Sequence, residues 1–331
     1  MLLASLRKDS SPQAGRLRGM MTDPRNQHVK HYINGRFVSQ YEAAIPLFDA
    51  GFLHGKQVWS APRLIKNHIF RFQDHLDKIR HSAEINFFPD IPSDEVIINA
   101  VRETLAYNQM NDGVHVRILV TPGTQVTASM DLAAIIDWQG TPSEPQVIVM
   151  PEYRGGVYDS QAGIALVTSS FKRPGPDTVD QTSHDNNQNA SSRALAEAKR
   201  LGATSALMYD PEGYLAEAPA SHVAIVKDGR FLTPHVRCCP PGVTRQVLLE
   251  ACANLKIESC EADLTPRDIE QADEIMLLGT MSGPVGAVSL DQKPVGSGAV
   301  GPVTRQLQHQ YQQMLMDPHH GYPIFDGNSP S

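Results

Sequence analysis

The stretch EGYLAEAPASHVAIVKDGRFLTP, residues 212–234, decides the fold of this chain. Two short turn sequences, DPEG ending at Gly213 and KDG ending at Gly229, separate runs that are rich in apolar residues. Asp, Pro and Gly favour turns because they suit turn backbone angles or hydrogen-bond to their own backbone. The stretch therefore predicts successive strands joined by tight turns.

The flanking segments add helices to this strand pattern. VTRQVLLEACANL, residues 243–255, predicts a helix that begins at Gly242, Val243 and Thr244, and EIMLLGT, residues 274–280, predicts a buried strand. SSRALAEAKRLG predicts a helix with Gly202 at its C-terminal cap. Residues 301–315 predict the final helix. This half of the chain is therefore of the mixed α/β class.

The amino-terminal half shows the same mixture. HYINGRFV, residues 31–38, contains an Asn34-Gly35 pair, which is a strong signal for a β-hairpin. QDHLDKIRHSAEI predicts a helix with an apolar face, and SDEVIINAVRETLAYNQM predicts a second helix capped by Ser93. Further strands are predicted at residues 115–123, at DLAAIIDW (131–138) and at QVIVMPEYRG (146–155).

The length of 331 residues suits two domains with separate cores. We predict a small domain at residues 29–150, a linker at 151–160 and a large domain at 161–318, with a tail at 319–331. Residues 1–28 are expected to be a disordered tail; a weak transit peptide is the alternative, because basic residues dominate this stretch.

Composition restricts the class of partner. The net charge of −7 argues against nucleic acid or an anionic membrane as the main partner, and no apolar run approaches a membrane span. The four cysteines show no CxxC spacing, so no metal site is expected and a reducing, cytoplasmic location fits best. A small-molecule partner is the better prediction.

Four motifs in order carry a resemblance to a known family: GFLHGKQVWSAPR (51–63), EGYLAEAPASHVAIVKDGRFLTP, PPGVTRQVLLEA (240–251) and EIMLLGT. Together they resemble the class IV aminotransferases, the fold-type IV pyridoxal-phosphate enzymes that include branched-chain and D-amino acid aminotransferases, (R)-selective amine transaminases and aminodeoxychorismate lyases. The resemblance covers roughly residues 31–315. It implies a smaller N-terminal α/β sandwich, a larger barrel-like C-terminal α/β domain, a site between them and a homodimer.

The resemblance also implies how a phosphate-bearing cofactor would be held. A phosphate suits an arginine and a helix N-terminus, where backbone N–H groups and the helix dipole favour an anion. A carboxylate would keep the pyridine nitrogen protonated. The family positions for the phosphate, the ring and its support correspond to Arg63, Val243, Thr244, Gly279, Thr280, Glu217 and Ser221.

The lysine that holds the cofactor covalently in this family has no counterpart. Counting back from Gly202 places it at position 184, or at 183 in the branched-chain spacing, and this chain has His184 and Ser183 there. Asn187 matches an asparagine that commonly follows the lysine and supports position 184. We therefore expect pyridoxal 5′-phosphate or pyridoxamine 5′-phosphate to bind non-covalently, with His184 as the acid–base group.

Two further positions bear on the substrate and on a relocated amine. The turn HGKQVW retains His54, at a position that often faces substrate in the family, and carries Lys56 in place of an aspartate or serine. Lys56 or Lys172 could supply a relocated amine, although a solvated surface lysine is the simpler interpretation of both. The residues after Asn187 are unusually polar for a segment beside the cofactor ring.

Three hypotheses for function follow. In the first, the protein is a transaminase or related enzyme acting on a small amine or amino acid, with His184 moving protons. In the second, it is a non-catalytic relative that binds the cofactor or a metabolite. In the third, the pocket performs chemistry without pyridoxal phosphate, with His184, Asp185 and His54 as an acid–base set.

Overall fold

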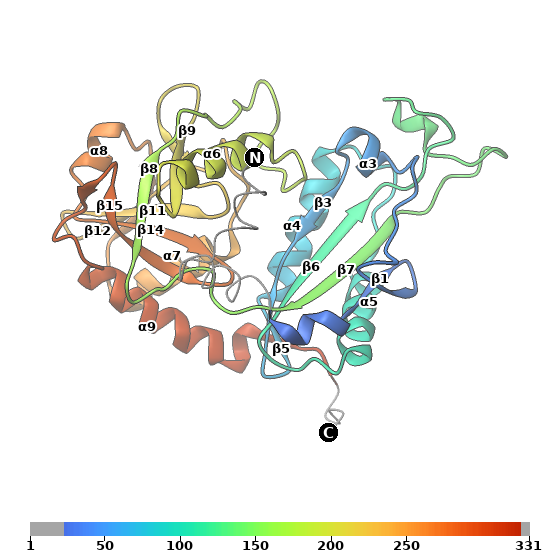
Figure 1. Cartoon of the computed structure of the whole chain (residues 1–331), viewed down its shortest axis with the longest axis horizontal. Helices are drawn as coiled ribbons and strands as arrows, with labels where there is room; N and C mark the ends of the chain where they lie inside the picture. The colour runs from blue at the N-terminus through green and yellow to red at the C-terminus, as the bar shows by residue number, and fades with distance from the viewer. Residues whose placement is uncertain (1–22, 326–331) are drawn as a thin grey trace, which may run out of the picture.

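The computed structural model describes residues 23–325, which form two α/β halves that face each other (Figure 1). The first half is built on an eight-stranded sheet with the order β17-β5-β4-β6-β7-β1-β2, and β3 pairs with β6. Its strands are β1 (Lys30–Ile33), β2 (Arg36–Ser39), β3 (Val58–Ser60), β4 (Arg63–Ile65), β5 (His68–Phe70), β6 (Val114–Thr121), β7 (Gln146–Tyr153) and β17 (Gly321–Pro323).

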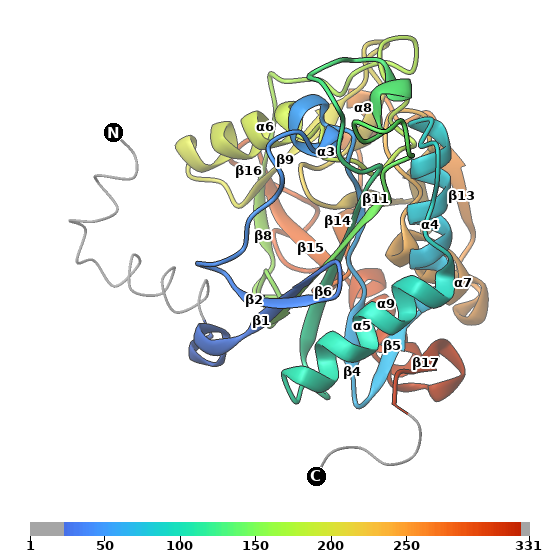
Figure 2. The ribbon, with the colours of Figure 1, turned by 90° about the vertical axis from the view of Figure 1, so that its right-hand side faces the viewer.

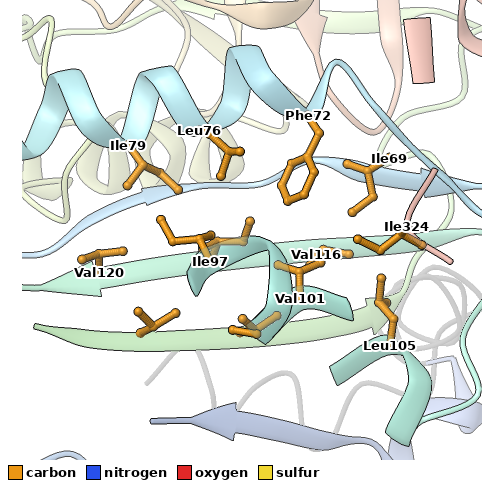
Figure 3. Close-up of a cluster of buried hydrophobic side chains, with 14 of the residues drawn as sticks. Ile69, Phe72, Leu76, Ile79, Ile97, Val101, Leu105, Val116, Val120 and Ile324 are labelled. Carbon is orange, nitrogen blue, oxygen red and sulfur yellow. The ribbon is translucent and has the colours of Figure 1, made fainter. Parts of the chain in front are cut away.

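Helices α4 (Phe72–Ile85) and α5 (Asp94–Tyr107) share one core with this sheet. The apolar side chains of α4 that the sequence indicated, Leu76, Ile79 and Ala83, are buried there, and Figure 3 shows Leu76 and Ile79 pointing toward the strands. Burying a Leu or Ile side chain contributes about 1.5–3 kcal/mol. Figure 2 shows both helices from the side of this domain. This packing fixes the orientation of α4, and therefore of its remaining side chains.

Strand β6 divides its side chains between two environments. Val114, Val116 and Ile118 belong to the core beneath α4 and α5, because alternate strand residues point to one face. His115 and Arg117, on the opposite face, line a pocket between the two halves. Strand β6 therefore links the core of the first half to the candidate site.

The second half is built on a nine-stranded sheet with the order β10-β9-β8-β15-β14-β11-β12-β13, and β16 pairs with β15. Its strands are β8 (Ile164–Thr168), β9 (Ser205–Tyr209), β10 (Leu215–Glu217), β11 (His222–Lys227), β12 (Arg230–Pro234), β13 (Ser259–Ala262), β14 (Glu274–Gly279), β15 (Gly283–Leu290) and β16 (Lys293–Pro294). The remaining helices are α3 (Ala50–His54), α6 (Asn189–Arg200), α7 (Val243–Leu255), α8 (Pro266–Glu270) and α9 (Pro302–Met316), with short 3-10 turns η1 (Pro24–His28), η2 (Leu132–Ala134) and η3 (Pro318–His320).

This sheet is buried on both faces, which explains its continuous apolar strands. On β11, Val223 and Ile225 enter one core cluster, whereas Ala224 and Val226 enter another that includes α7 and α9. Figure 1 shows α9 running beneath the sheet toward the first half. The buried strands hold Glu217 of β10 and the loop after β14 against the pocket.

Several local predictions are confirmed. Asn34 and Gly35 have φ values of 46° and 79° and join β1 to β2 as an antiparallel hairpin. Ser93 caps α5 by accepting a hydrogen bond from the backbone N–H of Val96. The mixed α/β class and the predicted helices and strands around residues 212–280 are also present.

Other predictions differ from the structure. The strand predicted at DLAAIIDW is wrong, because Asp131 instead caps the 3-10 turn η2 through a bond from the Ala133 N–H. The C-terminal tail expected from residue 319 instead forms β17, which pairs with β5, and Ile324 is fully buried. Strand β7 continues to Tyr153 by pairing with β6, so the connection between the halves begins at Arg154 rather than at 151.

The expected N-terminal tail is likewise ordered from residue 23, since Asn26 of η1 hydrogen-bonds to the Tyr153 backbone in both directions. Predictions for residues 1–22 and 326–331 lie outside the described residues. Across residues 23–325, no helix has both the length and the apolar composition needed to span a membrane.

Candidate active site

A pocket of about 480 Å³ lies where the two halves meet. This volume is within the usual range for small-molecule sites. The first half contributes side chains of β3, α4 and β6, and the second contributes β10, the start of α7 and the β14–β15 turn. The segment between β8 and α6, which carries His184, lies along one wall. Residues far apart in sequence therefore share one cavity.

Helix α4 presents a polar stripe toward this pocket. His75, Lys78 and Ser82 are spaced three and four residues apart, so they share one helix face beside the apolar face. His75 and Lys78 line the pocket. The Nδ1 of His75 lies 2.7 Å from the Ser60 hydroxyl of β3, and burial lowers the pKa of His75 to about 3. The stripe is thus fixed to the neighbouring strand.

His184 is held in place by α4 and β3. Its backbone N–H donates to the Ser82 hydroxyl at 2.9 Å, and its ring Nδ1 lies 2.6 Å from the backbone oxygen of Trp59. The imidazole also packs against the Trp59 indole, with ring centroids 3.9 Å apart. The carbonyl can only accept, so Nδ1 carries the proton and the neutral ring has an unprotonated Nε2.

Burial, together with the nearby Lys78, lowers the pKa of His184 well below its ordinary value. The imidazole is therefore neutral near pH 7. Among the described residues, no hydrogen bond joins Nε2 to another side chain or backbone group. His184 can accept a proton from a molecule in the pocket at this atom.

Glu217 of β10 forms a buried ion pair with Arg173, with Nε and Oε1 3.0 Å apart. The Arg173 guanidinium also donates to the Cys238 backbone oxygen and to the Ser191 hydroxyl. Burial raises the pKa of Glu217 to about 7, although the cationic Arg173 and Lys78 both favour the carboxylate. Glu217 can therefore hold or release a proton near neutral pH.

The start of α7 forms another part of the pocket wall. Val243 and Thr244 line the cavity, and no side chain of Gly242 can cap their backbone N–H groups. A Cβ at Gly242 would lie 2.2 Å from the His222 ring, so only glycine fits there. Gly279, Thr280 and Ser221 line the same region. Free N–H groups at a helix N-terminus favour an anion.

The sequence-predicted site residues divide into two groups. His184, Glu217, Ser221, Val243, Thr244, Gly279 and Thr280 line the pocket. Arg63 lies behind the wall, where its Nη1 is 3.4 Å from the Met281 backbone oxygen and its buried Nε has no partner. His54 and Lys56 are not among the lining residues. Lys172 is exposed and donates to the Pro211 backbone oxygen.

Glu217, His222 and Cys239 place three metal-capable atoms within 4.8 Å of one another. This cluster is poorly suited to a cation, because the Arg173 guanidinium already binds Glu217 and Lys78 lies nearby. The Cys239 thiol is also hard to ionise, since burial raises its pKa strongly. The arrangement fits an anionic or carbonyl-bearing ligand better than a metal ion.

Comparison with known proteins identifies the family. A family model described as amino-transferase class IV matches residues 61–290. The chain belongs to the class IV aminotransferases.

Curated relatives extend the match along most of this class IV chain. It is 33% identical over 301 residues, 91% of its length, to branched-chain-amino-acid aminotransferase-like protein 1 of Arabidopsis thaliana, and 30% identical over 270 residues to the branched-chain-amino-acid aminotransferase of Pseudomonas aeruginosa. The second alignment covers 80% of this chain and 83% of the bacterial protein, whereas the first covers only 53% of the plant protein. The chain thus spans about half the length of the plant relatives.

Solved structures show the same fold. The branched-chain aminotransferase of Thermoproteus uzoniensis, solved with norvaline, superimposes with a TM-score of 0.81 at 21% identity, covering 90% of this chain and 99% of the other. A second branched-chain amino acid aminotransferase, from the source abbreviated T.th. and solved with pyridoxamine 5′-phosphate, gives a TM-score of 0.77 at 24% identity, with the same coverage of both chains. These likenesses establish the class IV fold.

The structure of this class IV chain also reveals pocket residues that the sequence analysis did not select. Lys78, Arg117, Arg154, Arg173 and His222 all line the cavity. Two signals were available: the His75, Lys78 and Ser82 stripe has helical spacing, and residues 115 and 117 alternate with apolar residues on a strand. Neither pattern by itself shows that the face meets another domain.

Proposed function

We propose that this protein binds pyridoxal 5′-phosphate or pyridoxamine 5′-phosphate and transfers an amino group to or from a small amine or amino acid, with His184 as the acid–base group. The proposal requires only non-covalent binding of the cofactor. One observation carries it: the buried Glu217–Arg173 pair and the uncapped start of α7 meet in one pocket.

The residues present fit the phosphate of such a cofactor. The backbone N–H groups at the start of the 13-residue helix α7 face the cavity without a side-chain cap. Arg63 lies close behind them, with a buried Nε that lacks a partner. A phosphate would satisfy donors of both kinds. Val243, Thr244, Gly279, Thr280 and Arg63 are therefore the proposed phosphate-binding set.

Glu217 fits the ring of the cofactor. A pyridoxal ring, when bound with a protonated nitrogen, supplies an electron sink for the substrate Cα. The raised pKa of Glu217, about 7, lets this carboxyl share a proton with a ring nitrogen near neutral pH. Ser221, beside Gly279, lies where a hydroxyl can support the ring.

His184 is the proposed proton carrier, replacing the family lysine in this role. Its Nε2 is unprotonated and free to accept, while the Trp59 carbonyl fixes the ring orientation. A positioned histidine typically contributes about 10²–10⁴-fold to the rate of a proton transfer. A pKa below the ordinary value makes His184 a weak base, so its conjugate acid returns the proton readily.

Arginines at the opposite wall favour an anionic substrate group. Arg117 stacks on Trp59 with its guanidinium carbon 4.4 Å from the ring centroid, and Arg154 lines the same pocket. The substrate carboxylate of an amino acid would be attracted there. We also propose a cytoplasmic homodimer, since large apolar side chains such as Phe52, Met130 and Trp138 are exposed on the first half.

The test is a pair of measurements on the purified protein. Isothermal titration with pyridoxamine 5′-phosphate should show one saturable site, and loaded protein should convert 2-oxo acids to amino acids with a panel of amino donors. Binding without turnover across that panel would instead support a non-catalytic, cofactor-binding protein. Failure to bind either cofactor form would overturn the proposal and favour chemistry without pyridoxal phosphate. Light scattering tests the dimer.

A further inference from the structure

Lys78 brings an amine into the pocket from a helix outside the family motifs. Of the residues that the structure describes, Lys78 is the only lysine lining this cavity. Its position on α4 is fixed by the adjacent apolar residues Leu76 and Ile79, which are buried in the core. The direction of the Lys78 side chain is therefore imposed by packing.

Lys78 is a close neighbour of position 184. The Ser82 hydroxyl donates to the backbone oxygen of Lys78 at 2.7 Å and accepts from the backbone N–H of His184 at 2.9 Å. One hydroxyl group thus bridges the two residues. An amine on residue 78 enters the cavity beside the position where the family pattern expects the lysine.

Lys78 has no structural partner that explains its burial. Within residues 23–325, no hydrogen bond or ion pair is formed by its Nζ, although other lysines such as Lys227 pair with a carboxylate. The nearby Glu217 is already bound by Arg173. A buried, unpaired ammonium group is costly to maintain, which makes a functional role the better explanation.

The surroundings also favour the uncharged amine. Burial lowers the pKa of Lys78 to about 8, against the opposing influence of Glu217 and Cys239. A lysine amine must be uncharged to attack a carbonyl carbon, and a desolvated lysine is a recurrent nucleophile. Lys78 therefore combines access to the cavity with the required protonation state.

We propose that Lys78 is the residue that binds the aldehyde form of the cofactor covalently. This inference rests on the proposed function and adds a covalent bond to the non-covalent binding described above. The neutral Nζ attacks the aldehyde carbon, a C=N bond replaces the C=O bond, and the carbonyl oxygen leaves as water with the two nitrogen-bound hydrogens. The reaction needs no oxidant or reductant.

The wild-type chain provides the direct test. The protein is mixed with equimolar pyridoxal 5′-phosphate, reduced with borohydride, digested and mapped by tandem mass spectrometry. The expected result is a phosphopyridoxyl group on Lys78, with at least a tenfold loss of this label when excess pyridoxamine 5′-phosphate competes. Lys78→Arg and Lys78→Met should abolish the label, whereas Lys56→Arg and Lys172→Arg should retain it.

Binding of pyridoxamine 5′-phosphate separates this inference from the proposed function, because that form has no aldehyde. If it binds and competes while Lys78 remains unlabelled, the covalent role is overturned and the proposed function stands. Labelling only at other lysines has the same meaning. If neither cofactor form binds, both proposals are overturned. Circular dichroism of the two Lys78 variants verifies folding, and mapping of the wild-type chain does not depend on them.

Discussion

The backbone N–H of His184 donates a 2.9 Å hydrogen bond to the hydroxyl of Ser82. This contact ties the segment before α6 to helix α4, and therefore joins the two halves of the molecule beside the pocket. It also explains why a histidine at position 184 and a lysine at position 78 occupy one cavity. The site depends on this connection between halves.

Replacing Ser82 tests that connection. Ser82→Ala leaves the His184 N–H without its acceptor, and an unpaired buried polar group costs about 1–3 kcal/mol. We expect the free energy of urea unfolding to fall by this amount. Ser192→Ala, which removes an exposed hydroxyl bonded to the backbone oxygen of Asn189, should change it by less than about 0.5 kcal/mol. Equal effects of the two substitutions would show that the bond is unimportant.

The Glu217–Arg173 pair should matter far more for stability than an exposed pair. Arg173→Met leaves Glu217 buried without its cation, and breaking a buried pair typically costs about 3–5 kcal/mol. Arg237→Met removes a half-exposed partner of Asp263 and should cost about 0–1 kcal/mol. Thermal and urea unfolding of both variants provide the comparison; similar losses would contradict the structural role assigned to Arg173.

The proposed role of His184 predicts a separation of binding from turnover. His184→Gln should lower amino transfer by about 10²-fold or more while leaving the affinity for pyridoxamine 5′-phosphate nearly unchanged. In a Lys78→Arg background, His184→Lys should restore a borohydride-fixed label, now at position 184. Unchanged turnover in His184→Gln would exclude histidine as the proton carrier, and an unlabelled double variant that binds pyridoxamine 5′-phosphate would show that position 184 does not face the aldehyde.

Buried histidines predict loss of stability in acid. Burial lowers the pKa values of His75, His115 and His222 to about 3, below the ordinary value near 6.5. Between these values the unfolded chain binds protons that the folded chain does not, so stability rises with pH from about 3 to 6.5. Each such group contributes up to about 1.4 kcal/mol per pH unit.

His115→Gln should reduce that slope by one proton's contribution, as measured by urea unfolding between about pH 4 and 6.5. Its effect at about pH 7.5, where histidine is neutral in both states, measures the packing cost alone. Glu217 acts in the opposite direction: its pKa is raised from 4.5 to about 7, so its contribution is lost as pH rises through this window. An unchanged slope in His115→Gln would show that His115 titrates alike in both states.

Much of the fold could be predicted because local chemistry and tertiary structure agree. The Asn34-Gly35 turn and the Ser93 cap are examples, since each depends on residues adjacent in sequence. DLAAIIDW was misassigned because Asp131 bonds to its own backbone and begins a 3-10 turn instead of a strand. Strand β17 could not be foreseen, since it requires a distant partner, β5.

The site was predictable where a residue belongs to a motif and not where it depends on domain packing. Glu217 and Thr244 follow from matched motifs and line the pocket. Lys78 lies in a helix whose apolar periodicity is clear, but the sequence does not show that its polar face meets the second half. Arg173, adjacent to the exposed Lys172, similarly becomes buried only through its contacts with Glu217 and Ser191.

The most direct test of the central claim is calorimetric titration of the wild-type chain with pyridoxamine 5′-phosphate and, separately, with pyridoxamine, which lacks the phosphate. The start of α7 and Arg63 should make binding of the phosphate form at least tenfold tighter, at one site per chain. Absence of binding by both compounds, or equal affinity for the two, would contradict the assignment of this pocket as a cofactor site.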